Sequence, residues 1–384
     1  MRVHGGDILS YEAQFHKKPL DFSVNVSPLG LPAGVRQAVI DALDDSGQYP
    51  DTGCRALRQA LGEYHGIPKE WILCGNGAAD LIDRLATVLA GSAGRTDRQQ
   101  ILQQPDKDKD NHAPKKVLLT APTFTEYRFA LERVGLQCDS YPLKPENEFA
   151  IKEDILERIT PGLTAVLLCE PNNPTGKTTD RKLLIRILEK CKACGVMLII
   201  DECFQEFLDD PDAHTMQRYL VDPASDTGKK SGMDNPLLIL KSFTKTYAMA
   251  GIRLGYCLCA DQDLLAKMEQ AAQPWAVSGL AQAAGIAALK ETAYLQEIQT
   301  QNRTERERMK TALKDAGCRH VQGEANYILF WHERTDLAKC LAKKGILLRT
   351  CTDYEGLDAH WYRVGVLGKE DNDRLIEALA SERR

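Results

Sequence analysis

The sequence has no apolar run that approaches the roughly 18 residues needed to cross a membrane. Its first residues, Met1-Arg2-Val3-His4, are not followed by the hydrophobic core of a signal peptide. It also lacks a strong net charge, with 49 Lys and Arg against 54 Asp and Glu, and no basic stripe stands out. We therefore expect a cytoplasmic protein that acts on small metabolites, with no membrane and no nucleic-acid partner.

The cysteines lack the spacing of a disulfide framework or a zinc ribbon, although there are twelve of them. Several lie inside apolar runs, such as Cys169, Cys257 and Cys259, as reduced core thiols do. The Cys-x-x-Cys pair Cys191 and Cys194 lies in a Lys-rich helical pattern without a second pair. We therefore predict no metal site.

The chain length predicts two domains with a cleft between them, because 384 residues exceed the roughly 250 to 300 at which one core stops growing. Two segments, 91–116 and 222–235, are polar and have little to bury. We predict that both are surface insertions and that 91–116 has no chemical role.

Apolar strands alternate with helical patterns through the middle of the chain, which predicts a mostly parallel sheet covered on both faces. The predicted strands are 117–120, 164–169, 196–200 and 237–240. In such sheets, ligands bind beyond the carboxyl ends of the strands. The residues expected at that edge are Phe124, Asn173, Asp201 and Lys245.

Two segments in the first hundred residues could line a pocket. Residues 20–30 alternate apolar and polar side chains, which puts Ser23 and Asn25 on one face of an extended segment. That face could line a pocket, or it could be the solvent-exposed face of an edge strand. Gly75 and Gly77 separate an apolar strand from an amphipathic helix, so exposed backbone N–H groups at the helix start could bind a phosphate.

The segment after residue 240 combines two cations with hydroxyl groups. Lys245 follows a buried strand, where desolvation can make an amine nucleophilic, although such a lysine can also be a solvated end residue. Ser242, Thr244 and Arg253 suit a dianionic phosphate. A separate phosphate-loop reading of Gly176-Lys177-Thr178 fails, because Pro171 stands where that motif needs glycine.

Taken in order, Asn173-Pro174-Thr175-Gly176, Asp201-Glu202 and Ser242-x-x-Lys245 with Arg253 resemble the signature of the pyridoxal-phosphate enzymes of the aspartate-aminotransferase fold. Within this family the chain is most similar to the threonine-phosphate decarboxylases of the cobalamin pathway, which are relatives of the histidinol-phosphate aminotransferases. The further matching segments are 4–6, 21–30, 49–51, 75–77, 273–275 and 346–351.

The resemblance implies an α/β fold of type I, with a mostly parallel seven-stranded sheet in a large domain and a smaller α+β domain. Residues 1–45 would belong to the small domain, 46–275 to the large cofactor-binding domain and 276–384 to the rest of the small domain. In the last part we expect one long amphipathic helix over 277–313 and strands near 327–331 and 346–349.

The resemblance also implies the roles of the site residues. Lys245 would bind the aldehyde of pyridoxal 5'-phosphate and later move a proton, while Asp201 would pair with the pyridine nitrogen. Tyr49 would reach the phosphate in the neighbouring subunit, which implies a homodimer. The remaining cofactor contacts would come from Phe124 on the ring face, Asn173 on the ring hydroxyl, and Gly77, Ala78, Ser242, Thr244 and Arg253 on the phosphate.

Substrate binding is implied for Arg349 and Arg363 together with His4 and Asn25. Two guanidinium groups suit a substrate that bears both a carboxylate and a phosphate. Phe204 stands where aminotransferases of this fold have a tyrosine. We therefore expect a decarboxylase of a small O-phosphorylated amino acid, with threonine phosphate and serine phosphate both open, and a histidinol-phosphate aminotransferase as the alternative.

Overall fold

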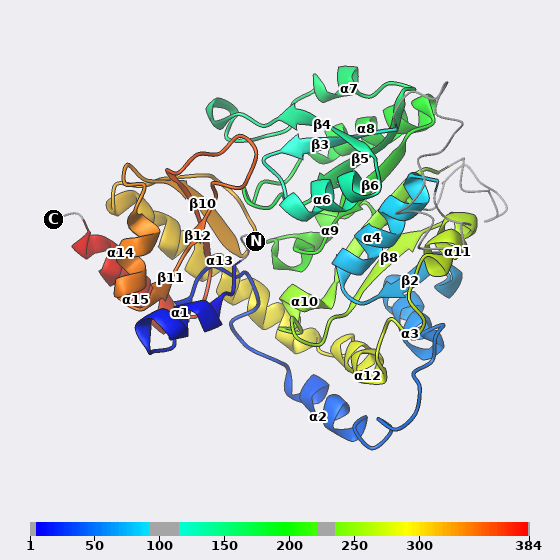
Figure 1. Cartoon of the computed structure of the whole chain (residues 1–384), viewed down its shortest axis with the longest axis horizontal. Helices are drawn as coiled ribbons and strands as arrows, with labels where there is room; N and C mark the ends of the chain where they lie inside the picture. Colours follow the sequence, from blue (N-terminus) through cyan, green and yellow to red (C-terminus); the bar gives the residue numbers. More distant parts are fainter. Residues whose placement is uncertain (1–4, 92–114, 221–234, 383–384) are drawn as a thin grey trace.

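The structure, a computed structural model, describes residues 5–91, 115–220 and 235–382, and its central feature is a seven-stranded sheet (Figure 1). Strand β8 runs antiparallel to both of its neighbours, while β3 to β7 pair in parallel. The mostly parallel sheet is thereby confirmed. In spatial order the strands are β2 (Ile72–Gly75), β8 (Gly255–Cys259), β7 (Leu237–Ser242), β6 (Met197–Asp201), β5 (Leu163–Cys169), β3 (Lys116–Ala121) and β4 (Gln137–Pro142).

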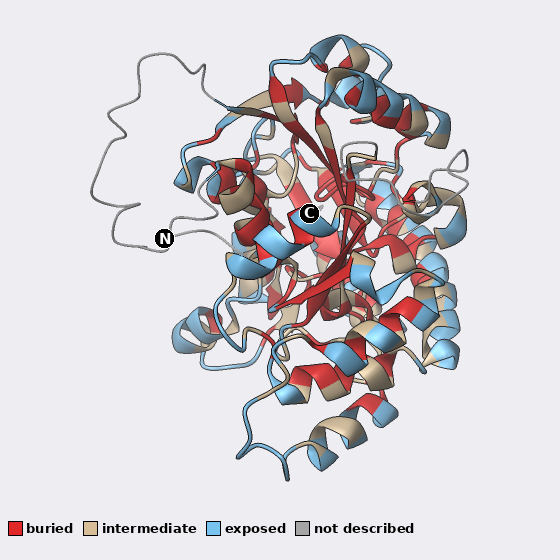
Figure 2. Ribbon diagram, turned by 90° about the vertical axis from the view of Figure 1, so that its right-hand side faces the viewer, coloured by how far each residue is buried: buried red, intermediate tan, exposed pale blue. Residues whose placement is uncertain are grey.

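The central strands are apolar without interruption because both faces of the sheet are covered by helices (Figure 2). Successive side chains point to opposite faces, so Ile199 and Ile200 belong to two different core clusters. The helices that accompany this sheet are α3 (Arg55–His65), α4 (Ala78–Leu89), α6 (Thr125–Arg133), α7 (Ile155–Arg158), α8 (Arg181–Cys194), α9 (Pro211–His214), α10 (Phe243–Thr246), α11 (Gln262–Gln270) and α12 (Gly279–Ala288).

A second, antiparallel sheet forms a smaller layer at the other side of the molecule (Figure 1). Its strands, in spatial order, are β12 (Arg349–Thr350), β13 (Trp361–Gly365), β10 (Tyr327–Trp331) and β9 (Arg319–His320). The helices of this part are α13 (Thr292–Asp315), α14 (Leu337–Lys343) and α15 (Lys369–Ser381).

The N-terminal segment contributes to both parts of the molecule. After α1 (Ile8–Phe15), the short strand β1 (Leu20–Asp21) pairs in parallel with β11 (Ile346–Leu347). The next helix, α2 (Ala33–Asp41), packs against α12. The domain boundaries at 45/46 and 275/276 stay predictions.

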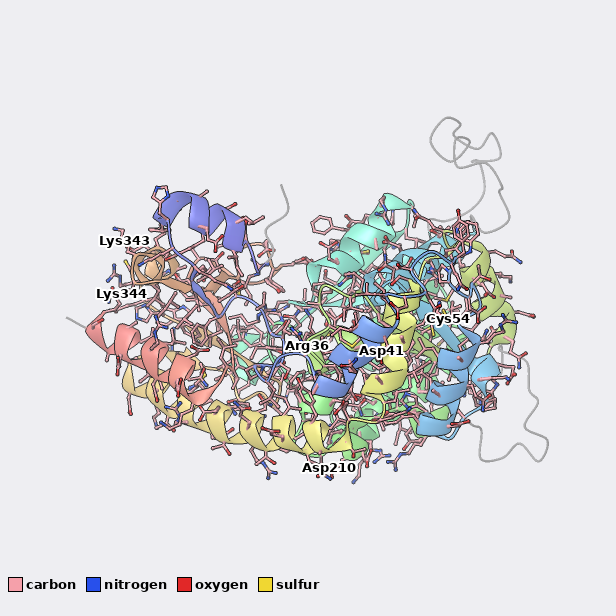
Figure 3. All side chains as sticks on the ribbon, turned by 90° about the horizontal axis from the view of Figure 1, so that it is seen from below. Arg36, Asp41, Cys54, Asp210, Lys343 and Lys344 are labelled. Carbon is pink, nitrogen blue, oxygen red and sulfur yellow. The ribbon has the colours of Figure 1, made fainter. Side chains whose placement is uncertain are left out.

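The long helix predicted over 277–313 is wrong, because the chain forms α12 and α13 with a break at 289–291. In α12, Gly285 lies so close to Leu57 and Leu254 that a Cβ atom would clash with both side chains. In contrast, α13 packs against α15 and β10, in the part of the molecule that carries Lys343 and Lys344 (Figure 3). Two different packing partners therefore require two helix axes.

Two predicted extended segments also differ in the structure. The predicted strand 346–349 divides at Leu348 between two sheets, with β11 paired to β1 and β12 paired to β13. Residues 20–30 are extended as a strand only at Leu20–Asp21, and the edge-strand interpretation is wrong because Ser23 and Asn25 are buried. Of the predicted insertions, residues 92–114 and 222–234 lie outside the described residues. Among the described helices, none combines the length and the apolar character that a membrane crossing needs.

Candidate active site

A pocket of about 240 Å³ lies beyond the carboxyl ends of the central strands, between the two sheets. The strand-following residues meet there as the sequence predicted, because parallel strands end at the same edge. Its lining contains the following predicted site residues: Asn25, Ala78, Phe124, Asn173, Asp201, Ser242, Thr244, Lys245, Arg253, Arg349 and Arg363.

Two predicted site residues of the described part, Gly77 and Tyr49, do not line this pocket. Gly77 precedes α4 with φ of +80°, and a Cβ atom at this position would lie 2.6 Å from Nη2 of Arg253, so glycine lets the guanidinium approach the helix start. Tyr49 is 80% exposed and stacks on Trp275 at 4.4 Å, so its predicted contact with a neighbouring subunit stays a prediction. His4 lies outside the described residues.

One end of the pocket is suited to a phosphate group. The twelve-residue helix α4 begins at Ala78 and directs its unpaired N–H groups and the positive end of its dipole toward this end. The Ser242 hydroxyl caps α10 by accepting from the Thr244 amide at 3.1 Å. Arg253 adds a formal charge beside Gly77. Together these groups make a cationic cradle with several donors.

Lys245 lies in α10, directly after β7, and its amine lines the pocket 6.0 Å from the centre of the Phe204 ring. Burial is the main cause that lowers the pKa of this amine to about 8, and the positive charges of Arg363 and Arg253 act in the same direction. The neutral, nucleophilic form of the amine is therefore far more populated near neutral pH than in an exposed lysine, although the charged form still predominates.

Asp201 ends β6 and is 5% exposed. One carboxylate oxygen, Oδ2, accepts from the Tyr127 hydroxyl at 2.6 Å, and the other, Oδ1, accepts from the Cys203 amide at 2.9 Å. Two donors stabilise the ionised form of a buried carboxylate. Asp201 can thus present a negative charge to a cationic group in the pocket.

Asn173 is oriented by two donors that share its carbonyl oxygen. Nη1 of Arg363 donates to Oδ1 at 2.7 Å, and the Tyr354 hydroxyl donates to the same atom at 3.4 Å. The amide nitrogen is therefore the group left to donate to a molecule in the pocket. This orientation suits the predicted contact between Asn173 and a ring hydroxyl.

The two arginines differ in how their charge is compensated. Arg363 is buried and its Nη2 donates to the Ser23 carbonyl at 2.7 Å, so both of its described partners are neutral oxygen atoms. Arg349 is paired with the Asp353 carboxylate at 2.7 Å, and its guanidinium lies 5.2 Å from the centre of the Tyr354 ring. The positive charge of Arg363 is thus the more available one for an anion.

Two buried donors in this region have no partner among the described residues: Nε of Arg363 and Nδ2 of Asn25. Leaving a buried donor unpaired costs about 1–3 kcal/mol, so such atoms mark a place where a ligand is expected. With the amine of Lys245, the carboxylate of Asp201 and the cationic cradle, these residues fit a phosphorylated pyridine aldehyde and an anionic substrate.

Tyr127, Cys203 and Tyr354 are among the pocket residues that the sequence analysis did not assign. Tyr127 could have been found, because it lies one helical turn after Phe124 on a predicted helix. Tyr354 follows no periodic pattern, since it lies in the loop between β12 and β13. Outside the pocket, Cys191 and Cys194 both lie in α8 without a disulfide, and burial raises the pKa of Cys191 to about 12.

This fold and this pocket define the class of pyridoxal-phosphate-dependent enzymes of the aminotransferase fold. The chain belongs to the aminotransferase class I and II family, whose model matches residues 17–379. Its cofactor is pyridoxal 5'-phosphate.

Individual relatives cover nearly the whole chain. The chain is 35% identical to the threonine-phosphate decarboxylase of Salmonella typhimurium, over 98% of this chain and 95% of that protein. Its fold is similar to that of the histidinol-phosphate aminotransferase from Clostridium acetobutylicum, with a TM-score of 0.81, 26% identity, and 95% of this chain and 99% of the other covered. The histidinol-phosphate aminotransferase from Sinorhizobium meliloti in complex with pyridoxal 5'-phosphate shares the fold, with a TM-score of 0.80, 20% identity and 100% and 95% covered.

Replacing Lys245 by methionine is expected to stabilise the cofactor-free protein at pH 7. The pKa of this lysine is about 8 in the folded chain against an ordinary 10.5. Between pH 8 and 10.5 the unfolded chain therefore binds more protons than the folded chain. The free energy of unfolding of the wild type consequently rises with pH through that window. At pH 7 the variant should gain about 1–3 kcal/mol, and the gain should shrink toward pH 10.5. Urea unfolding of both cofactor-free proteins at several pH values measures this difference.

The matched control is Lys116→Met, because Lys116 is 42% exposed and lies outside the pocket. This variant should leave the pH dependence of unfolding unchanged. A Lys245→Met variant that is destabilised equally at pH 7 and pH 10 would show that the amine carries no burial penalty.

Proposed function

We propose that this protein decarboxylates L-threonine O-3-phosphate to (R)-1-amino-2-propanol O-2-phosphate, and that L-serine O-phosphate is a further substrate. The observation that carries the proposal is the meeting of Arg349 and Arg363 in one small pocket with Lys245. Two guanidinium groups match a compact substrate with two anionic ends. The 35% identity to a threonine-phosphate decarboxylase supports the same reaction, and the product would supply the aminoalcohol linker of cobalamin.

The bound cofactor supplies an electron sink for the bond that breaks at the substrate Cα. The residues proposed to hold it are Asp201 at the ring nitrogen, Phe124 on the ring face, Asn173 at the ring hydroxyl, and Gly77, Ala78, Ser242, Thr244 and Arg253 at the phosphate. The carboxylate of Asp201 keeps a proton on the ring nitrogen, because a buried negative charge favours the cationic ring.

Lys245 holds the cofactor and also moves protons. With a pKa near 8, its amine can both accept and donate a proton at neutral pH. Decarboxylation ends when Cα receives a proton in place of the lost carboxylate, and Lys245 is the titratable amine that lines the pocket. We assign this protonation to Lys245.

The protein would have to hold the substrate anions so that the carboxylate, and not the hydrogen, is the group that leaves Cα. Arg363 is suited to this task, since Asn173 and the Ser23 carbonyl fix the plane of its guanidinium. The unpaired Nε of Arg363 and Nδ2 of Asn25 add donors for the substrate anions. His4 is proposed to join them from the N-terminal segment.

Phe204 gives the pocket an apolar wall near the amine of Lys245. Its ring is buried and packs edge to face against Tyr327 at 5.1 Å. A phenylalanine at this position cannot donate to the oxygen of the cofactor ring, in contrast to the tyrosine usual in aminotransferases of this fold. The difference is consistent with a reaction other than transamination.

The second candidate function is transamination of histidinol phosphate. It is favoured by the 26% identity and the TM-score of 0.81 to the Clostridium acetobutylicum aminotransferase. Both candidates share the cofactor, the lysine and the two arginines. They differ in whether the carboxylate or a hydrogen leaves Cα.

We further propose that the protein acts in the cytoplasm as a homodimer in which Tyr49 binds the cofactor phosphate of the neighbouring subunit. The exposed stack of Tyr49 on Trp275 supports this proposal, because such aromatic surface is typical of interfaces. We place the large domain at 46–275 and the small domain at 1–45 and 276–384.

Purified protein incubated with pyridoxal 5'-phosphate and L-threonine O-3-phosphate, without any keto acid, is expected to release carbon dioxide and the phosphorylated aminoalcohol. A parallel reaction with histidinol phosphate and 2-oxoglutarate should yield little glutamate. Rapid glutamate formation with no carbon dioxide from threonine phosphate would replace the decarboxylase proposal with the aminotransferase.

A further inference from the structure

Asp201 receives a hydrogen bond from a side chain to which no role has been given. Tyr127, in the first turn of α6, is fully buried, and its hydroxyl donates to Oδ2 of Asp201 at 2.6 Å. The Cys203 amide donates to Oδ1 at 2.9 Å, so both carboxylate oxygens accept a hydrogen bond from the protein. Asp201 also lines the pocket.

The same tyrosine also supports the aromatic side chain proposed to cover the cofactor ring. The rings of Phe124 and Tyr127 meet at 5.4 Å with an interplanar angle of 84°, which is the favourable edge-to-face arrangement. Phe124 immediately precedes α6, so Tyr127 and Phe124 are one helical turn apart. One side chain thus contacts both residues that are proposed to hold the ring.

The chemistry of Tyr127 suits a permanent donor. Burial and the neighbouring negative charge of Asp201 raise the pKa of the phenol well above its usual range. The hydroxyl therefore keeps its proton and continues to donate to the carboxylate. A hydrogen bond to a charged acceptor in a buried site is among the stronger ones.

We propose that Tyr127 is a positioning residue that keeps Asp201 ionised and aimed at the ring nitrogen of the bound cofactor. It acts through Asp201 and makes no contact with the substrate. The inference rests on the proposed place of Asp201 at the ring nitrogen, and it holds for either candidate reaction. Weakening this hydrogen bond should therefore weaken cofactor binding and reduce the positive charge on the ring.

Tyr127→Phe tests the proposal, because it removes one oxygen atom and keeps the ring that packs on Phe124. The dissociation constant of pyridoxal 5'-phosphate, measured by absorbance titration, is expected to rise by about tenfold or more. The pH midpoint of the visible cofactor band, which is the pH at which its absorbance is half changed, should move to higher pH. A less positive ring makes the nitrogen joined to Lys245 more basic. Borohydride should still bleach the band, since Lys245 is unchanged.

The chain offers a matched control in Tyr141→Phe. The Tyr141 hydroxyl likewise donates to an aspartate, Asp154, but Tyr141 lies on β4, Asp154 directly precedes α7, and neither residue lines the pocket. This variant should keep the dissociation constant and the pH midpoint of wild type, whatever happens to its thermal stability. Equal shifts of the dissociation constant and the pH midpoint in both variants would overturn the proposal, because they would show a general loss of structural stability.

Unchanged cofactor affinity and an unchanged pH midpoint in Tyr127→Phe would also overturn the proposal and leave Tyr127 as a core residue. If this variant does not fold, 3-fluorotyrosine placed at position 127 keeps the hydrogen bond with a more acidic hydroxyl. The pH midpoint should then move by a measurable step, and its constancy would count against the proposal. A wrong choice of reaction is detected separately, by the carbon dioxide assay.

Discussion

Lys245→Ala is expected to abolish the visible absorbance band of the bound cofactor that borohydride can bleach. The amine lies in the pocket with a pKa near 8, and the structure describes it beside the carboxylate, aromatic and arginine groups that fit the cofactor. Turnover should fall by about 10²–10⁴-fold or more, because the same amine is assigned the proton transfer. Absorbance spectra before and after borohydride, together with the rate of carbon dioxide release, measure both effects.

Two comparison variants distinguish the loss of the covalent bond between Lys245 and the cofactor from the loss of a positive charge. Lys245→Arg keeps the positive charge and cannot bind the aldehyde, so it should lose the band as well. Lys116→Ala removes an exposed lysine whose nearest anion is Asp139 at 3.9 Å, and it should retain the band. A Lys245→Ala protein that keeps a bleachable band would show that another lysine holds the cofactor.

Arg363→Lys is expected to reduce kcat/KM for threonine phosphate by about 30- to 4,000-fold, which corresponds to roughly 2–5 kcal/mol. Lysine keeps the charge but loses the fork that now bonds Asn173 and the Ser23 carbonyl. It also removes the buried Nε that has no partner among the described residues. Steady-state kinetics with threonine phosphate, alongside a cofactor titration, measures the change.

Cofactor affinity should fall much less than kcat/KM in Arg363→Lys, because Arg363 is assigned to the substrate and reaches the cofactor site only through Asn173. Arg319→Lys is the control, since the Arg319 guanidinium lies over the Trp331 ring at 3.8 Å and outside the pocket. It should leave kcat/KM unchanged. A normal kcat/KM in Arg363→Lys would remove Arg363 from the substrate site and transfer the role to Arg349.

Much of the cofactor site could be predicted from local sequence patterns. Apolar runs end just before Asn173, Asp201 and Ser242, and parallel strands deliver their carboxyl ends to one edge. Gly77 could be assigned to a helix start because a glycine precedes an amphipathic run there. These signals are local, so neighbouring residues are enough to read them.

Other parts of the fold depended on partners that are distant in sequence. The break between α12 and α13 follows from packing of Gly285 against Leu57 and Leu254, which no helical period shows. The division of 346–350 between two sheets depends on which strand each short segment meets. In both cases, burial against another element outweighed the local preference.

The sequence by itself determined the parallel sheet, the edge at which Phe124, Asn173, Asp201 and Lys245 gather, and the family to which this pattern belongs. Only the tertiary structure decided that Tyr127 supports Asp201, that Arg363 orients Asn173, and that Asp353 compensates Arg349. The reason is that strand and helix periods arise from neighbours along the chain. Hydrogen-bond partners and unpaired donors are set by side chains that meet only when distant segments pack together.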